Sequence, residues 1–139
     1  MSDLGSKVKI FMVSRSVIQN ELLTQHIKSS IGCPCVAYRE LDQISMDEIE
    51  RQKGLILLDY KDHNLRILFP NFIQRVNLLF PNCLVALLNM KQGSNDERQF
   101  KKAKIQGIFF ENASSDALIK GIRAILDEGM RTIPLIIPS

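Results

Sequence analysis

The segment GLILLD, residues Gly54–Asp59, decides the fold. Its four consecutive apolar residues lack the alternation of a half-exposed strand, so both faces of the segment should be buried, as in the central strands of parallel sheets. The segment Cys83–Leu88 has the same character, and Asn89 ends its apolar run. Two such strands predict a parallel sheet with helices packed on both faces.

Strand and helix patterns alternate on either side of these two segments. Further strands are predicted at Val8–Val13, Cys35–Tyr38 and Gly107–Phe110. Helices are predicted, in chain order, from Ser16 to about Ile31, after Ser45, over Phe69–Phe80, after Ser94, and from Ser114 or Ser115. Five β-α units in succession predict a flavodoxin-like, doubly wound five-stranded parallel sheet with strand order 2-1-3-4-5.

Three of the predicted helices open with a capping box, in which a serine is followed three residues later by a glutamine or glutamate. The pairs are Ser16 with Gln19, Ser45 with Glu48, and Ser94 with Glu97. The helix after Ser94 has little apolar surface and carries the basic residues Arg98, Lys101, Lys102 and Lys104. We interpret this basic cluster as a solvated face, with a dimer contact or a DNA-backbone contact as alternatives.

The composition is that of an ordinary globular domain. Of the 139 residues, 45% are hydrophobic and 24% are charged, and the net charge of +3 is too small to indicate a nucleic-acid binder by itself. The length fits one domain, to which we assign residues 1–130, with residues 131–139 as a tail or the start of a linker. Because there is no secretory signal and no apolar run of about 18 residues, we expect no membrane contact and a cytoplasmic location.

No catalytic or metal site is predicted. Cys33, Cys35 and Cys83 lack zinc-site or thioredoxin spacing, and we expect three reduced, partly buried thiols. His26 and His63 make no metal-binding spacing either. The chain has no nucleophile-elbow triad and no glycine-rich phosphate loop. A small α/β enzyme would need a convergent polar cleft at the strand ends, so we do not expect an enzyme.

Asp59 is the candidate functional residue. Ligands of open α/β sheets gather at the carboxyl ends of the strands, and Asp59 is a lone carboxylate delivered to that edge by a buried strand. Here the sequence resembles the receiver domains of two-component response regulators, which place a phosphoacceptor aspartate at the end of the third strand. The resemblance implies an acidic pair after strand 1, a Ser or Thr after strand 4 and a Lys after strand 5.

The sequence departs from the receiver pattern at each of those supporting positions. Ser14 and Arg15 stand in place of the acids, Asn89 in place of the hydroxyl and Glu111 in place of the lysine, and Ile108 occupies the place of the aromatic switch residue. Phosphoryl transfer needs a divalent cation and a lysine to neutralise the developing charge, so we expect a degenerate pocket without Mg²⁺. Asp59 would then pair with Arg15 or accept hydrogen bonds from the loop. A functional phosphoreceiver is the alternative.

The chain also resembles a narrower group, the atypical receiver domains of CsgD/VpsT-type LuxR-family biofilm transcription regulators. The matching residues are Leu88-Asn89 after strand 4, Gly107–Phe110 in strand 5, and the run from Leu118 to Leu126 in the last helix. The resemblance implies a homodimer that works without conventional phosphorylation. It also implies DNA binding through a C-terminal helix-turn-helix domain, for which residues 130–139 are too few.

One branch of that group binds cyclic di-GMP through a motif that follows the last helix, begins with Trp and ends with Arg. The aligned residues here run from Thr132 to Leu135, and the chain has no tryptophan. Arg131 and Thr132 are the candidate ligand-binding residues of this tail, because an arginine can stack on guanine or pair with phosphate. A cyclic di-GMP-sensing domain is therefore a second alternative.

Overall fold

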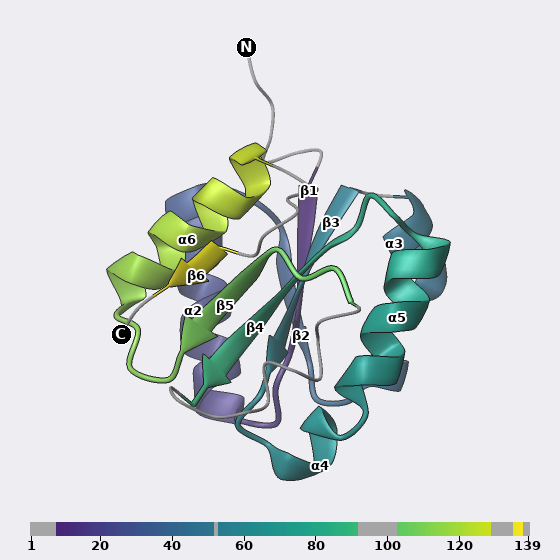
Figure 1. The fold of residues 1–139 in the computed structure, drawn as a ribbon. Coiled ribbons are helices and arrows are strands. Elements are labelled where there is room, and N and C mark those ends of the chain that lie inside the picture. The colour runs from purple at the N-terminus through teal and green to yellow at the C-terminus, as the bar shows by residue number, and fades with distance from the viewer. Residues whose placement is uncertain (1–7, 52, 92–102, 129–134, 138–139) are drawn as a thin grey trace.

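The structure, a computed structural model, describes residues 8–51, 53–91, 103–128 and 135–137. Its strands are β1 (Val8–Val13), β2 (Cys35–Tyr38), β3 (Lys53–Asp59), β4 (Leu84–Met90), β5 (Gly107–Phe110) and β6 (Leu135–Ile137). Its helices are α2 (Val17–Ile31), the 3-10 turn η1 (Leu41–Gln43), α3 (Met46–Arg51), α4 (His63–Arg66), α5 (Phe69–Leu79) and α6 (Ser115–Glu128). Figure 1 shows a twisted sheet between two layers of helices.

The sheet is parallel throughout and has the order β2-β1-β3-β4-β5-β6. The predicted doubly wound order 2-1-3-4-5 is therefore confirmed. A sixth strand extends it, formed by three residues of the segment that we had assigned to a tail. The sequence did not predict this strand because Pro134 and Pro138 bracket a run too short to carry a strand pattern.

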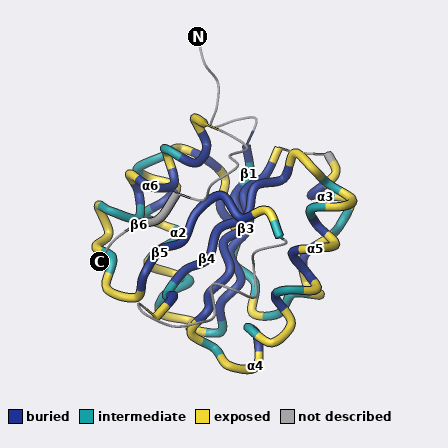
Figure 2. Tube along the Cα trace, viewed as in Figure 1, coloured by how far each residue is buried: buried dark blue, intermediate teal, exposed yellow. Residues whose placement is uncertain are grey.

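Two hydrophobic cores lie on opposite faces of the sheet. Alternate residues of β1 divide between them: Phe11 and Val13 pack with α5 on one face, and Ile10 and Met12 pack with α2 and α6 on the other. The residues Leu55 to Leu58 of β3 have no exposed surface, which confirms the predicted burial on both faces. Figure 2 shows the buried strands enclosed by helices whose outer faces are exposed.

The helix starts follow the predicted serines, but the capping boxes close differently. Ser16 Oγ accepts the backbone N–H of Gln19 at 3.2 Å, and Ser114 Oγ accepts that of Ala117 at 3.1 Å. Glu48 forms an ion pair with Lys9, with 2.7 Å between Oε2 and Nζ. The predicted box at Ser94 and most of the basic cluster lie outside the described residues.

The three cysteines are free, and each is at most 3% exposed, so they are more deeply buried than the partly buried thiols that we expected. Among the residues that the structure describes, no helix is both long and apolar enough to cross a membrane.

Candidate functional site

The carboxyl ends of β1, β3 and β4 bring three of the predicted site residues together. Asp59 ends β3 and is only 3% exposed, and Ser14, directly after β1, is fully buried. Asn89 is the penultimate residue of β4 and is half-buried. Since Asp59 pairs in register with Leu88, the neighbouring Asn89 side chain reaches the Asp59 carboxylate.

Four neutral donors hold that carboxylate. Asp59 Oδ2 accepts hydrogen bonds from Ser14 Oγ at 2.6 Å and from Gln19 Nε2 at 3.2 Å. Asp59 Oδ1 accepts hydrogen bonds from Asn89 Nδ2 at 2.7 Å and from the backbone N–H of Lys61 at 3.0 Å. None of these donors carries a charge. We call the three side chains and the Lys61 N–H the neutral clamp.

The clamp is braced by bonds among its own members. Asn89 Nδ2 also donates to Gln19 Oε1 at 3.2 Å, and Gln19 Nε2 also donates to Ser14 Oγ at 3.4 Å. The backbone N–H of Ser16 donates to Ser14 Oγ at 3.2 Å. Each side chain of the clamp is therefore oriented by at least one partner besides Asp59, which rigidifies the network.

Gln19 is the member that the sequence analysis missed. It was predicted to close the capping box at Ser16, but its side chain turns inward to Asp59. The position of Gln19 in the first turn of the helix after β1 could have indicated its contact with Asp59, because that turn borders the carboxyl ends of the strands.

A β-bulge at the end of β4 aims Asn89 at Asp59. The β4–β5 register pairs Leu87 with Ile108 and then Met90 with Phe110, so Leu88 and Asn89 together oppose a single residue of β5. Asn89 has φ 59°, in the left-handed region that asparagine adopts more readily than most residues. Bulges of this kind re-aim side chains next to functional sites.

We expect Asn89→Gly to lower the free energy of unfolding by about 1–3 kcal/mol, because a buried carboxylate loses a donor. Asn89→Thr should cost more than Asn89→Gly, since a β-branched residue at positive φ adds about 1–3 kcal/mol of strain. Urea denaturation of both variants measures the difference. Equal stability of the threonine variant and the parent would contradict the assigned backbone conformation.

Arg15 does not pair with Asp59. Of the two arrangements that we expected for Asp59, the structure contains the one in which its carboxylate accepts hydrogen bonds. The Arg15 guanidinium lies 2.8 Å from Glu40 Oε1 and 3.4 Å from Asp62 Oδ1. Its hydrogen bond to Glu40 is the largest cause that raises the pKa of Arg15 above its ordinary value. Asp62 also caps α4 by accepting the N–H of Leu65 at 3.0 Å. Arg15 thus ties together three loops at the strand ends.

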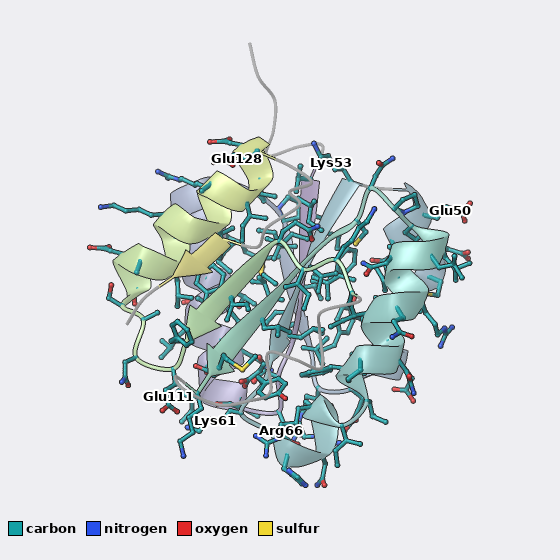
Figure 3. All side chains as sticks on the ribbon, viewed as in Figure 1. Glu50, Lys53, Lys61, Arg66, Glu111 and Glu128 are labelled. Atoms are coloured by element: carbon teal, nitrogen blue, oxygen red, sulfur yellow. The ribbon has the colours of Figure 1, made fainter. Side chains whose placement is uncertain are left out.

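The other predicted positions lie apart from Asp59. Glu111 is exposed, and its backbone N–H donates to the carbonyl of Met90 at 3.0 Å. Figure 3 shows Glu111 and Lys61 at the same end of the molecule. Ile108 is a core residue, 6% exposed. Arg131 and Thr132, the candidate ligand-binding tail, lie outside the described residues.

A small pocket adjoins the clamp. It has a volume of about 30 Å³, enough for about two water molecules. The residues that line it are Gln19, Leu23, Leu88, Asn89, Phe110, Ala113 and Leu118. Within the described ranges, no group of three or more His, Cys, Asp or Glu side chains is placed to hold a metal ion.

Comparison with known proteins finds similarity at the level of structure. No family model and no curated protein sequence matches the chain. The regulatory domain of the biofilm regulator CsgD is 22% identical, with a TM-score of 0.65 over 88% of this chain and 89% of that one. An atypical orphan response regulator, described as having a phosphorylation-independent mechanism, is 13% identical, with a TM-score of 0.67 over 88% and 99%.

A third similar structure has an intact metal site. The receiver domain of the sensor histidine kinase PA1611 from Pseudomonas aeruginosa, which coordinates a magnesium ion in its active-site cleft, is 15% identical. Its TM-score is 0.65 over 87% of this chain and 95% of that one. Together these likenesses show that the chain has the receiver fold of response regulators.

Proposed function

We propose that this chain is a non-catalytic regulatory receiver domain of a LuxR/CsgD-type transcription regulator, acting in the cytoplasm by homodimerisation and without conventional phosphorylation. The single observation that carries the proposal is the neutral clamp on Asp59. DNA would be bound through a C-terminal helix-turn-helix domain and not by the receiver domain itself. The likeness to CsgD supports the type of regulator by analogy of fold.

The clamp opposes phosphorylation in two ways. Attack on a phosphoryl donor requires a free carboxylate oxygen, whereas both Asp59 oxygens already accept two hydrogen bonds each. The reaction also needs positive charge near the transferred group. Lys61 contributes only its backbone N–H to the clamp, and Arg15 is committed to Glu40 and Asp62.

The residues at this edge do not fit a magnesium ion. Mg²⁺ prefers carboxylate and water ligands in octahedral geometry. The clamp itself contains no carboxylate, and the oxygens of Asp59 face donor groups of the clamp that would repel a cation.

Incubation with a small acyl-phosphate donor and Mg²⁺ tests the proposal. We expect no phosphoryl adduct by intact-mass spectrometry, under conditions that label a receiver domain with its acidic pair and lysine intact. An adduct that disappears in Asp59→Asn would establish the chain as a phosphoreceiver. Light scattering over a range of concentrations tests dimerisation directly, and a monomer throughout would refute that part of the proposal.

The alternative proposal is that the domain is regulated by cyclic di-GMP, bound through Arg131 and Thr132. A calorimetric titration with cyclic di-GMP, followed by light scattering, separates it from a ligand-independent dimer. Heat that is lost in Arg131→Ala, together with a change in mass, would favour the cyclic di-GMP reading. No heat would favour dimerisation without this ligand.

A further inference from the structure

The residues of β5 are as fully buried as those of a strand in the interior of a sheet. All four of its residues are buried, whereas β2, at the opposite end of the sheet, carries exposed and half-buried residues. Without a neighbour beyond it, β5 would leave a row of backbone N–H and C=O groups unpaired at the sheet edge. β6 is that neighbour, with Leu135, Ile136 and Ile137 in register with Gly107, Ile108 and Phe109.

β6 pairs with the outer edge of β5 over a very short length. It is three residues long, and the prolines on either side in the sequence have no N–H with which to extend a ladder. A parallel strand of this length makes few ladder hydrogen bonds, so its attachment is among the least stable in the sheet. Figure 1 shows β6 at the end of the sheet, between β5 and α6.

We propose that two copies of the chain exchange β6, so that the strand of each copy pairs with β5 of the other. This inference rests on the homodimer proposed above and names its interface. Exchange preserves every contact between β6 and β5, so the dimer needs no new complementary surface, and the two-fold arrangement closes on itself. The connection from Glu128 to Leu135 can span roughly 20 Å when extended, which lets the strand reach a neighbouring copy.

A disulfide across the β5–β6 pair tests the exchange directly. Ile108 and Ile136 are register partners, so Ile108→Cys/Ile136→Cys places two thiols on adjacent strands. The native cysteines are buried and contribute little background. After oxidation at a concentration where light scattering shows a dimer, we expect a covalent dimer on non-reducing electrophoresis. Ile108→Cys and Ile136→Cys alone serve as controls and should remain monomeric on the gel.

The possible outcomes separate this inference from the proposed function. A dimer in solution whose double-cysteine variant forms only internal cross-links overturns strand exchange and leaves dimerisation standing. A monomer at every concentration overturns both.

A second variant measures what the strand contributes. N–H groups alternate sides along a strand, so Leu135→Pro/Ile136→Pro removes one that faces β5. We expect the dimer dissociation constant to rise by at least about tenfold, with faster amide exchange at Gly107–Phe110 and the far-UV circular dichroism of the remaining domain retained. An unchanged dissociation constant with accelerated exchange would overturn the proposal.

Discussion

Asp59→Asn should lower the free energy of unfolding by about 3 kcal/mol, because hydrogen bonds to a buried charged group contribute about 1.5–3 kcal/mol each. Asparagine keeps the size of the side chain but has one acceptor oxygen. Its NH₂ group would face donors of the clamp, either Ser14 and Gln19 or Asn89 and the N–H of Lys61. Urea denaturation at neutral pH measures the loss.

Two further variants show whether the loss arises from the clamp. Glu111→Gln removes an exposed carboxylate from the same end of the molecule and should change stability by no more than about 0.5 kcal/mol. A double-mutant cycle between Asp59→Asn and Ser14→Ala should give a coupling energy above about 0.5 kcal/mol, since the two side chains bond directly at 2.6 Å. Unchanged stability in Asp59→Asn would mean that the clamp does not hold the native carboxylate.

The native Cys35 and Cys83 thiols should react on the order of a thousandfold more slowly than exposed cysteines, because the thiolate is the reactive form. Burial raises the pKa of both Cys35 and Cys83 from 9.0 to about 12, and three pH units correspond to a thousandfold change in thiolate concentration. Labelling with a thiol reagent at pH 8, with and without denaturant, measures the ratio. Fast labelling of Cys35 or Cys83 in the native chain, located by mass spectrometry, would contradict the assigned burial.

The same thiols make stability fall at alkaline pH. Above about pH 9 the unfolded thiols lose protons while the native thiols keep theirs until about pH 12, so the unfolded state binds fewer protons and becomes more favourable. The loss should approach about 1 kcal/mol per thiol for each pH unit in this window. Comparison with the Cys35→Ala/Cys83→Ala variant separates the contribution of the two thiols from that of other titrating groups. Identical profiles of stability against pH for the two proteins would refute the predicted contribution.

The strands were predictable because their signal is local. The apolar runs of β1, β3 and β4 are buried on both faces, so composition alone marks them. The short elements η1 and α4 were missed because each has at most four residues, too few for periodicity. They are held by capping side chains, Gln43 at η1 and Asp62 at α4, that a sequence pattern of this length does not distinguish from a loop.

The site was predictable in position and only partly in its contacts. Topology places the ends of β1, β3 and β4 together, so Asp59, Ser14 and Asn89 were expected to be neighbours. The role of Gln19 depended on how the first turn of α2 faces the sheet. The destination of Arg15 depended on Glu40 and Asp62, which lie far from it in the sequence and belong to two other loops. Positive φ at Asn89 leaves no composition signal.

The extra residue in β4 determines how phosphotransfer could be engineered into this chain. A threonine introduced at position 89 would have to adopt a positive φ that disfavours it, so side-chain substitutions alone would give destabilised variants. Deleting one residue between Leu87 and Met90 would instead remove the bulge and let β4 and β5 run in continuous register. In this chain, a threonine at position 89 without backbone strain thus requires a change in the length of β4, which point substitutions cannot supply.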